Sequence, residues 1–89
     1  MTEDELRYLI EKGVFESRLP IRTSEERRAY RAQEAELKQL FRVNLAQLHG
    51  LQGHPKEPLL FDIAWDHGHS AGYVEVLQYY DQFADLVKP

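Results

Sequence analysis

The feature that most constrains this chain is a long stretch of helix-compatible sequence in its middle. Residues 24–48 contain neither glycine nor proline, the two residues that most disfavour a helix interior. Thr23 and Glu26 form a capping-box pair before this stretch, and Gly50 follows it as a helix stop. Its apolar residues recur at helical spacings, at Tyr30, Leu37, Leu40, Phe41, Leu45 and Leu48. The sequence therefore predicts a helix over residues 24–48.

The N-terminal segment repeats the same signals on a smaller scale. Thr2 and Glu5 form a second capping-box pair, and Gly13 provides a second stop, so we expect a short helix over residues 2–12. Pro20 then disfavours helix in the segment 13–23, which we interpret as an ordered linker. Its apolar residues are available to the core, namely Val14, Phe15, Leu19 and Ile21.

The C-terminal segment, residues 58–87, also has a helical pattern. Its apolar positions lie mostly three and four residues apart, and Pro58 suits the first turn of a helix. Gly68 and Gly72 interrupt the middle of the pattern, so we expect the helix to be broken or kinked near Gly68. No run of alternating β-branched residues indicates a strand.

These elements predict an all-α fold for residues 1–89, which have the length of a single small domain. The two long helices would form a helical hairpin, with the short N-terminal helix beside it. A lone hairpin buries little apolar surface. We therefore expect residues 1–22 to fold back on the hairpin, or a second copy to complete the core as a homodimer.

Composition excludes several classes of protein. The chain has no cysteine, which rules out disulfide scaffolds, thiolate metal sites and thiol nucleophiles. No apolar run approaches the roughly 20 residues that span a bilayer, and the first residues are acidic where an export signal is basic. We therefore expect a cytoplasmic protein without a membrane partner, and no motif predicts a cofactor.

Charge is unevenly distributed along the chain. Basic and acidic residues balance over residues 1–55, so the whole net charge of −4 comes from residues 56–89. Phosphate repels such an acidic part. The central helix nevertheless carries a basic stripe, made of Arg27, Arg28, Arg31, Lys38 and Arg42. This stripe favours a nucleic-acid-associated protein as the alternative function, although interspersed glutamates also fit a solvated, salt-bridged surface.

The segment around Trp65 is the most unusual in the chain. On one continuous helix, four residues would share a stripe suited to close helix packing, namely Phe61, Gly68, Gly72 and Val76. This stripe could pack within the chain against the central helix, or it could form a dimer seam or a groove for a partner. Asp62, Asp66 and His69 share a second face that could hold a divalent metal, but solvated acids explain it more simply. Asp66, His67 and Ser70 lack the geometry of a hydrolytic triad, so we predict no catalytic residue and no enzyme.

A partner protein is the best-supported target of the exposed aromatic and acidic residues. Tyrosine and tryptophan are enriched in binding hot spots, and an acidic helix can meet a basic cleft on another protein. The residues predicted to bind a partner are Trp65, His69, Tyr73, Tyr80, Asp81 and Asp85.

One series of residues in this region also carries a family resemblance. It reads Ala64-Trp65-Asp66-His67-Gly68-His69-Ser70-Ala71-Gly72-Tyr73-Val74-Glu75-Val76 and is followed by Tyr80-Asp81 and Leu86-Val87. Over about residues 30–87 the chain resembles a group of small, uncharacterised tailed-phage proteins with an Ala-Trp-x-x-Gly-His-Ser-x-Gly-x-x-Glu-Val stretch. The resemblance assigns no role to any residue. It implies a protein made in an infected bacterial cytoplasm, where many small acidic phage proteins bind a host enzyme. The sequence thus predicts a non-enzymatic module that binds and modulates a host protein.

Overall fold

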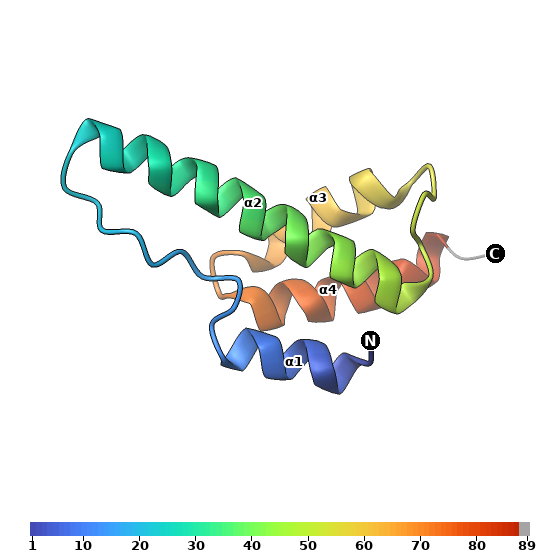
Figure 1. The fold of residues 1–89 in the computed structure, drawn as a ribbon. Helices are drawn as coiled ribbons and strands as arrows, with labels where there is room; N and C mark the ends of the chain where they lie inside the picture. The colour runs from blue at the N-terminus through green and yellow to red at the C-terminus, as the bar shows by residue number, and fades with distance from the viewer. Residues whose placement is uncertain (88–89) are drawn as a thin grey trace.

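A computed structural model describes residues 1–87, which form four α-helices and no strand (Figure 1). The helices are α1 (Glu3–Glu11), α2 (Ser24–His49), α3 (Glu57–Gly68) and α4 (Tyr73–Val87). The predicted all-α class is confirmed. None of the helices in this part of the chain has both the length and the apolar character that crossing a membrane requires.

The predicted capping signals define the first two helices. At the start of α2, Thr23 Oγ1 accepts a hydrogen bond from the Glu26 amide at 3.1 Å. At its end, Gly50 adopts a positive φ of 67°, and the Leu51 amide donates to the Ala46 carbonyl at 2.8 Å. This is the Schellman arrangement, in which a left-handed residue closes the last turn. Thr2 and Gly13 play the same two roles around α1.

The expected break near Gly68 is a complete chain reversal. Helix α3 ends at Gly68, and α4 begins at Tyr73 and returns along α3, so the C-terminal arm of the predicted hairpin is itself two helices (Figure 1). A Cβ atom on Gly68 would lie 2.7 Å from the Val76 backbone nitrogen, closer than real Cβ contacts allow. Gly68 therefore permits the start of α4 to pack directly against the end of α3.

The core lies between the α3–α4 hairpin and the helices packed on it. Its buried residues come from all four helices and two loops, and they are Leu6, Phe15, Phe41, Leu45, Leu51, Leu60, Phe61, Ala64, Val76, Leu77, Tyr80 and Ala84. The burial of Leu6 and Phe15 shows that the N-terminal segment folds back on the hairpin, which was one of the two ways we expected the core to be completed.

The linker contributes less to the core than expected. Of its four apolar residues only Phe15 is buried, whereas Val14, Leu19 and Ile21 remain exposed. The reason is the length of α2, whose 26 residues span about 39 Å at 1.5 Å per residue. The first half of α2 extends past the other helices, and the linker must leave the core to reach its start (Figure 1).

Candidate functional site

A cavity of about 160 Å³ lies at the turn between α3 and α4. Three of the predicted partner-binding residues line it, namely Trp65, His69 and Tyr73. The remaining lining residues are Gly72 in the turn, Val76 on α4 and Glu34 on α2. The chain reversal thus brings together residues from three elements, and we call this set the turn site.

The aromatic rings of the turn site hold one another in place. His69 lies one helical turn beyond Trp65, and their rings stack with a 5.6 Å centroid separation and a 5° interplanar angle. His69 Nδ1 lies 2.8 Å from the Trp65 carbonyl oxygen. Because a carbonyl only accepts, Nδ1 carries the proton in this contact and Nε2 is left as an acceptor in the neutral ring. His69 is exposed, so this acceptor is accessible to a partner.

Tyr73 anchors the site to the N-terminal segment. Its hydroxyl donates to the Phe15 carbonyl oxygen at 2.7 Å, and its ring packs edge-on against Phe41 at 5.0 Å. Burial, with a smaller contribution from the Glu34 carboxylate, raises the pKa of the Tyr73 phenol. Tyr73 therefore remains a neutral donor, and the linker, α2 and α4 meet at its ring.

Two charges of opposite sign border the rings. Lys38 Nζ lies 4.5 Å from the centroid of the Trp65 ring, within cation–π distance. Glu34, one turn earlier on α2, is exposed and lines the cavity. The cavity therefore combines aromatic surface with an acceptor carboxylate, a combination that suits a basic or amide-bearing side chain.

The other three predicted partner-binding residues are separate from the turn site. Asp81 and Asp85 are exposed on α4, and Asp81 lies eight residues beyond Tyr73, about 12 Å along the helix axis. Asp81 Oδ1 is 3.7 Å from His49 Nε2. Tyr80 was expected at the surface, but this prediction is wrong. Its side chain is fully buried, and its hydroxyl donates to Glu57 Oε1 at 3.3 Å.

Only three of the four predicted helix-packing residues are buried between the helices of the hairpin. Phe61, Gly68 and Val76 are buried in the hairpin, as a packing role requires. Gly72 instead lies in the turn with a φ of 131°, because the helix ends before it. Gly68 therefore packs against α4 and not against the central helix, since the chain reversal places the two hairpin helices side by side.

The five residues of the predicted basic stripe on α2 fall into two groups, two that contact other side chains of the domain and three that are exposed. Arg42 donates from Nε and Nη2 to Glu57 Oε2, at 2.9 and 2.6 Å, and Lys38 lies over Trp65. Arg27, Arg28 and Arg31 are exposed on the projecting half of α2. Only these three arginines remain for the nucleic-acid alternative, because the other two cations already contact acidic or aromatic groups.

The aspartate and histidine side chains considered as metal ligands do not lie close enough together to bind one ion. Within residues 1–87, no three His, Cys, Asp or Glu side chains lie close enough to hold a metal ion, so Asp62, Asp66 and His69 form no such site. His67 Nδ1 lies 2.8 Å from the Ile63 carbonyl oxygen, and its ring packs against Tyr79 and Phe83.

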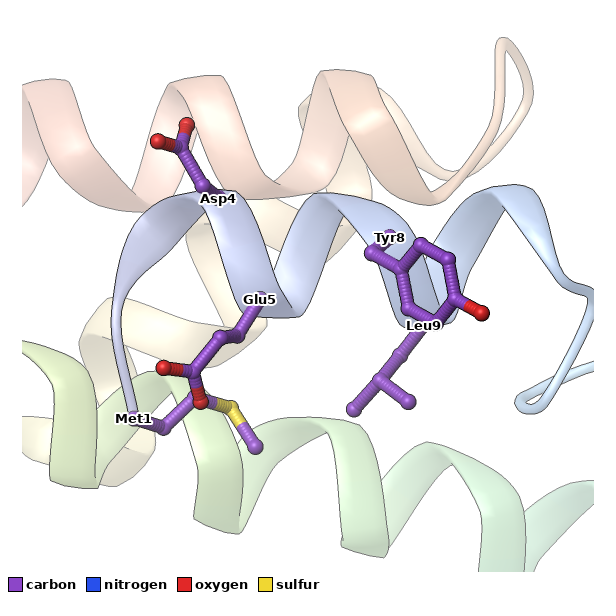
Figure 2. Close-up of a pocket in the computed structure, with 5 residues that line it drawn as sticks. All are labelled: Met1, Asp4, Glu5, Tyr8 and Leu9. Carbon is purple, nitrogen blue, oxygen red and sulfur yellow. The ribbon is translucent and has the colours of Figure 1, made fainter.

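Sequence reasoning missed two surface features. An apolar groove of about 250 Å³ runs between α3 and α4, and its lining residues are Lys56, Leu59, Leu60, Ile63, Phe83, Leu86 and Val87. The sequence did contain an indication of this groove. Leu59 and Ile63 lie four residues apart, on a side of α3 away from the core residue Phe61, and so form an apolar face outside the core. A second, wider groove follows α1, where Met1, Glu5 and Leu9 point towards α2 and Asp4 towards α4 (Figure 2). Glu34 was also not expected in the turn site. The spacing of residues within α3 does not indicate which part of α2 packs beside the turn.

Together these features define a small all-α domain, built on an antiparallel α3–α4 hairpin with an aromatic cavity at its turn. Residues 3–88 match the model of DUF8546, a family of unknown function, and the chain belongs to that family. No curated protein and no solved structure matches the chain significantly.

Proposed function

We propose that this chain is a non-enzymatic protein-binding module, encoded by a phage, that binds and modulates a host protein through the turn site. The observation that carries the proposal is the convergence of Trp65, His69 and Tyr73 with Glu34 around one small cavity. Two aromatic rings and a histidine, partly exposed and already fixed by mutual contacts, lose little conformational freedom on binding.

The size of the cavity favours a side chain of a partner over a small-molecule substrate. Ligand pockets that enclose a whole small molecule usually measure about 300–1,000 Å³. The turn site measures about 160 Å³, which is enough for one protruding side chain. The Glu34 carboxylate, which is exposed beside the rings, favours a lysine or arginine there, held by an ionic contact.

The charge of the surrounding surface favours the same type of partner. The net charge of −4 resides in residues 56–89, and Asp81 and Asp85 are exposed on α4 beyond the turn site. A basic host surface would be attracted to this half of the domain, and complementary charge mainly accelerates and orients association. The resemblance to tailed-phage proteins supplies the expectation that the partner is a bacterial protein.

An affinity pull-down from nuclease-treated bacterial lysate tests the proposal. We expect one host protein in stoichiometric amount with the unaltered chain, and its loss with Glu34→Lys or Trp65→Ala. Asp81→Lys should weaken capture, and more so at low salt, because its charge acts at longer range. Glu36→Lys is the matched control, since it makes the same exchange at an exposed position of the same helix.

Two outcomes would contradict the proposal. Capture that is equally strong with folded Glu34→Lys and Trp65→Ala proteins would show that the turn site is not the binding surface. Retention of nucleic acid alone, in lysate without nuclease and lost on charge reversal of Arg27 and Arg31, would favour the alternative function.

A further inference from the structure

The α3–α4 hairpin has an outer face that residues 1–87 leave uncovered. On this face Leu59, Ile63 and Leu86 expose 63%, 38% and 80% of their surface. They surround the apolar groove of about 250 Å³ between the two helices. An apolar patch of this kind on a small domain usually marks an interaction site.

The order of residues along α3 indicates what covers this face. Lys56, at the N-cap of α3, and Leu59, Ile63 and Asp66 within the helix are all exposed, and successive members lie three, four and three residues apart. This spacing places them on one stripe of the helix, and it reads the same in both directions. The stripe begins with a cation, ends with an anion and has two apolar residues between them.

We infer that a second copy of this chain binds the outer face, with the two α3 helices antiparallel about a two-fold axis. In a two-fold contact, residue i of one copy meets residue j of the other, and the reverse contact also forms. Antiparallel pairing of the stripe places Leu59 opposite Ile63 of the other copy. It also places Lys56 opposite Asp66, twice in each dimer.

The charges at the two ends of the stripe are free to make these contacts. Within residues 1–87, neither the Lys56 ammonium nor the Asp66 carboxylate has an ion-pair partner in its own chain. Pairing in the opposite, parallel sense would place like charges opposite each other at both ends. The stripe therefore specifies the antiparallel arrangement, as charge pattern does at helix interfaces generally.

Helix α4 adds apolar surface to the same contact. Phe83 and Leu86 line the groove beside Leu59 and Ile63. Stable interfaces begin at about 1,200 Å² in total, or roughly 600 Å² on each copy. The surface of one copy is 6057 Å², so the contact requires about a tenth of it.

This contact leaves the turn site open. Trp65 lies two residues beyond Ile63, about 200° away around α3, and its ring meets Lys38 of α2. A dimer would thus present two turn sites at once. The inference does not rest on the proposed function, because self-association can be measured on the purified chain alone.

Sedimentation equilibrium over a range of protein concentrations, with charge-exchanged variants, tests the pairing. We expect a concentration-dependent dimer that Lys56→Asp or Asp66→Lys weakens about tenfold or more, because each change places like charges opposite each other twice. The double variant, Lys56→Asp with Asp66→Lys, should recover most of the affinity, since every pair is again of opposite sign. Glu36→Lys, outside the face, should leave the dimer unchanged.

Cysteine cross-linking determines the register independently, because the natural chain has no cysteine. A mixture of Lys56→Cys and Asp66→Cys chains should form disulfide-linked heterodimers on mild oxidation. Lys56→Cys alone should not, because its two copies would lie about 15 Å apart along the helices. A monomer at every concentration would overturn the inference, and so would a double variant as weak as the single ones together with no heterodimer cross-link.

Discussion

The Arg42 guanidinium donates to the Glu57 carboxylate through two nitrogens, with the shorter contact at 2.6 Å. Glu57 is only 5% exposed, and it also accepts the Tyr80 hydroxyl at 3.3 Å. These three residues belong to α2, α3 and α4, so a single buried carboxylate joins three helices. The hydrogen bond to Glu57 raises the pKa of Arg42, so the guanidinium keeps its charge.

Replacing Glu57 with glutamine should destabilise the fold substantially. The change leaves the Arg42 guanidinium beside a neutral acceptor, and removing one partner of a buried pair typically costs about 3–5 kcal/mol. We expect about 2 kcal/mol, because the Arg42 side chain is 30% exposed and water can compensate part of the loss. Urea unfolding gives the free energy directly. Arg7→Gln is the control, since it breaks an exposed pair with Glu3 and should cost under about 0.5 kcal/mol.

Stability should fall at alkaline pH, and Tyr80 should account for part of the fall. Burial, followed by the negative charge of Glu57, raises the pKa of Tyr80 in the folded state above its ordinary value of about 10. Its contribution is therefore complete below about pH 10, and it is lost as pH rises because only the unfolded chain readily ionises this phenol. Unfolding free energies at pH 8 to 11 should decline less steeply for Tyr80→Phe. Tyr8→Phe removes an exposed phenol and is the control; an identical slope in all three proteins would contradict the assignment.

Adding one methyl group at Gly68 should be more harmful than adding one in a loop. The Cβ of Gly68→Ala would lie 2.7 Å from the Val76 nitrogen and 2.8 Å from the Glu75 carbonyl carbon, both backbone atoms that cannot rotate away. We expect a loss of about 2–3 kcal/mol despite the better helix propensity of alanine. Gly53→Ala meets no atom within 4 Å and should cost only the strain of its positive φ, about 1 kcal/mol. Thermal unfolding of the two variants distinguishes these cases, and equal losses would show that α4 does not approach α3 this closely.

The two halves of α2 should differ in hydrogen exchange. Buried residues of this helix begin at Phe41, and none lies between residues 24 and 40. A helix segment that packs on little else depends on its own marginal stability and opens easily. We expect the amides of residues 27–32, which precede the contacts of Gln33 with Ser17 and of Glu34 with the turn site, to exchange at least about tenfold faster than those of residues 42–48. Uniform protection along α2 would mean that a partner or a second copy covers its projecting half.

Local signals predicted the boundaries of the helices well. Thr2, Thr23, Gly13 and Gly50 each satisfy or terminate backbone groups within a few residues, so their effect can be read without knowing the fold. The break at Gly68 was also visible. The angle between the two helices could not be predicted, because a full chain reversal depends on the contact between Gly68 and the backbone of α4.

The site was predicted less completely, because it depends on tertiary contacts. Trp65, His69 and Tyr73 do lie together, but Glu34 joins them only because α2 packs beside the turn. Tyr80 belongs to the apolar helical pattern of residues 58–87, but it was assigned to the partner surface because tyrosine is enriched in binding hot spots and acidic residues lie near it in sequence. Its hydroxyl donates to Glu57, which lies 23 residues away in sequence. The local pattern around Tyr80 does not indicate this hydrogen bond to a buried carboxylate.

The dominance of the α3–α4 contact has a consequence for the order of folding. These helices are adjacent in sequence and share more contacts than any other pair of elements, so their pairing requires little loop closure and should be fast. Helices α1 and α2, in contrast, bury their apolar residues mainly against this hairpin. Because a ribosome synthesises α1 and α2 first, they must wait for α3 and α4 to emerge. Leu6, Phe41 and Leu45 therefore remain in contact with water, or with a chaperone, until α3 and α4 have been synthesised.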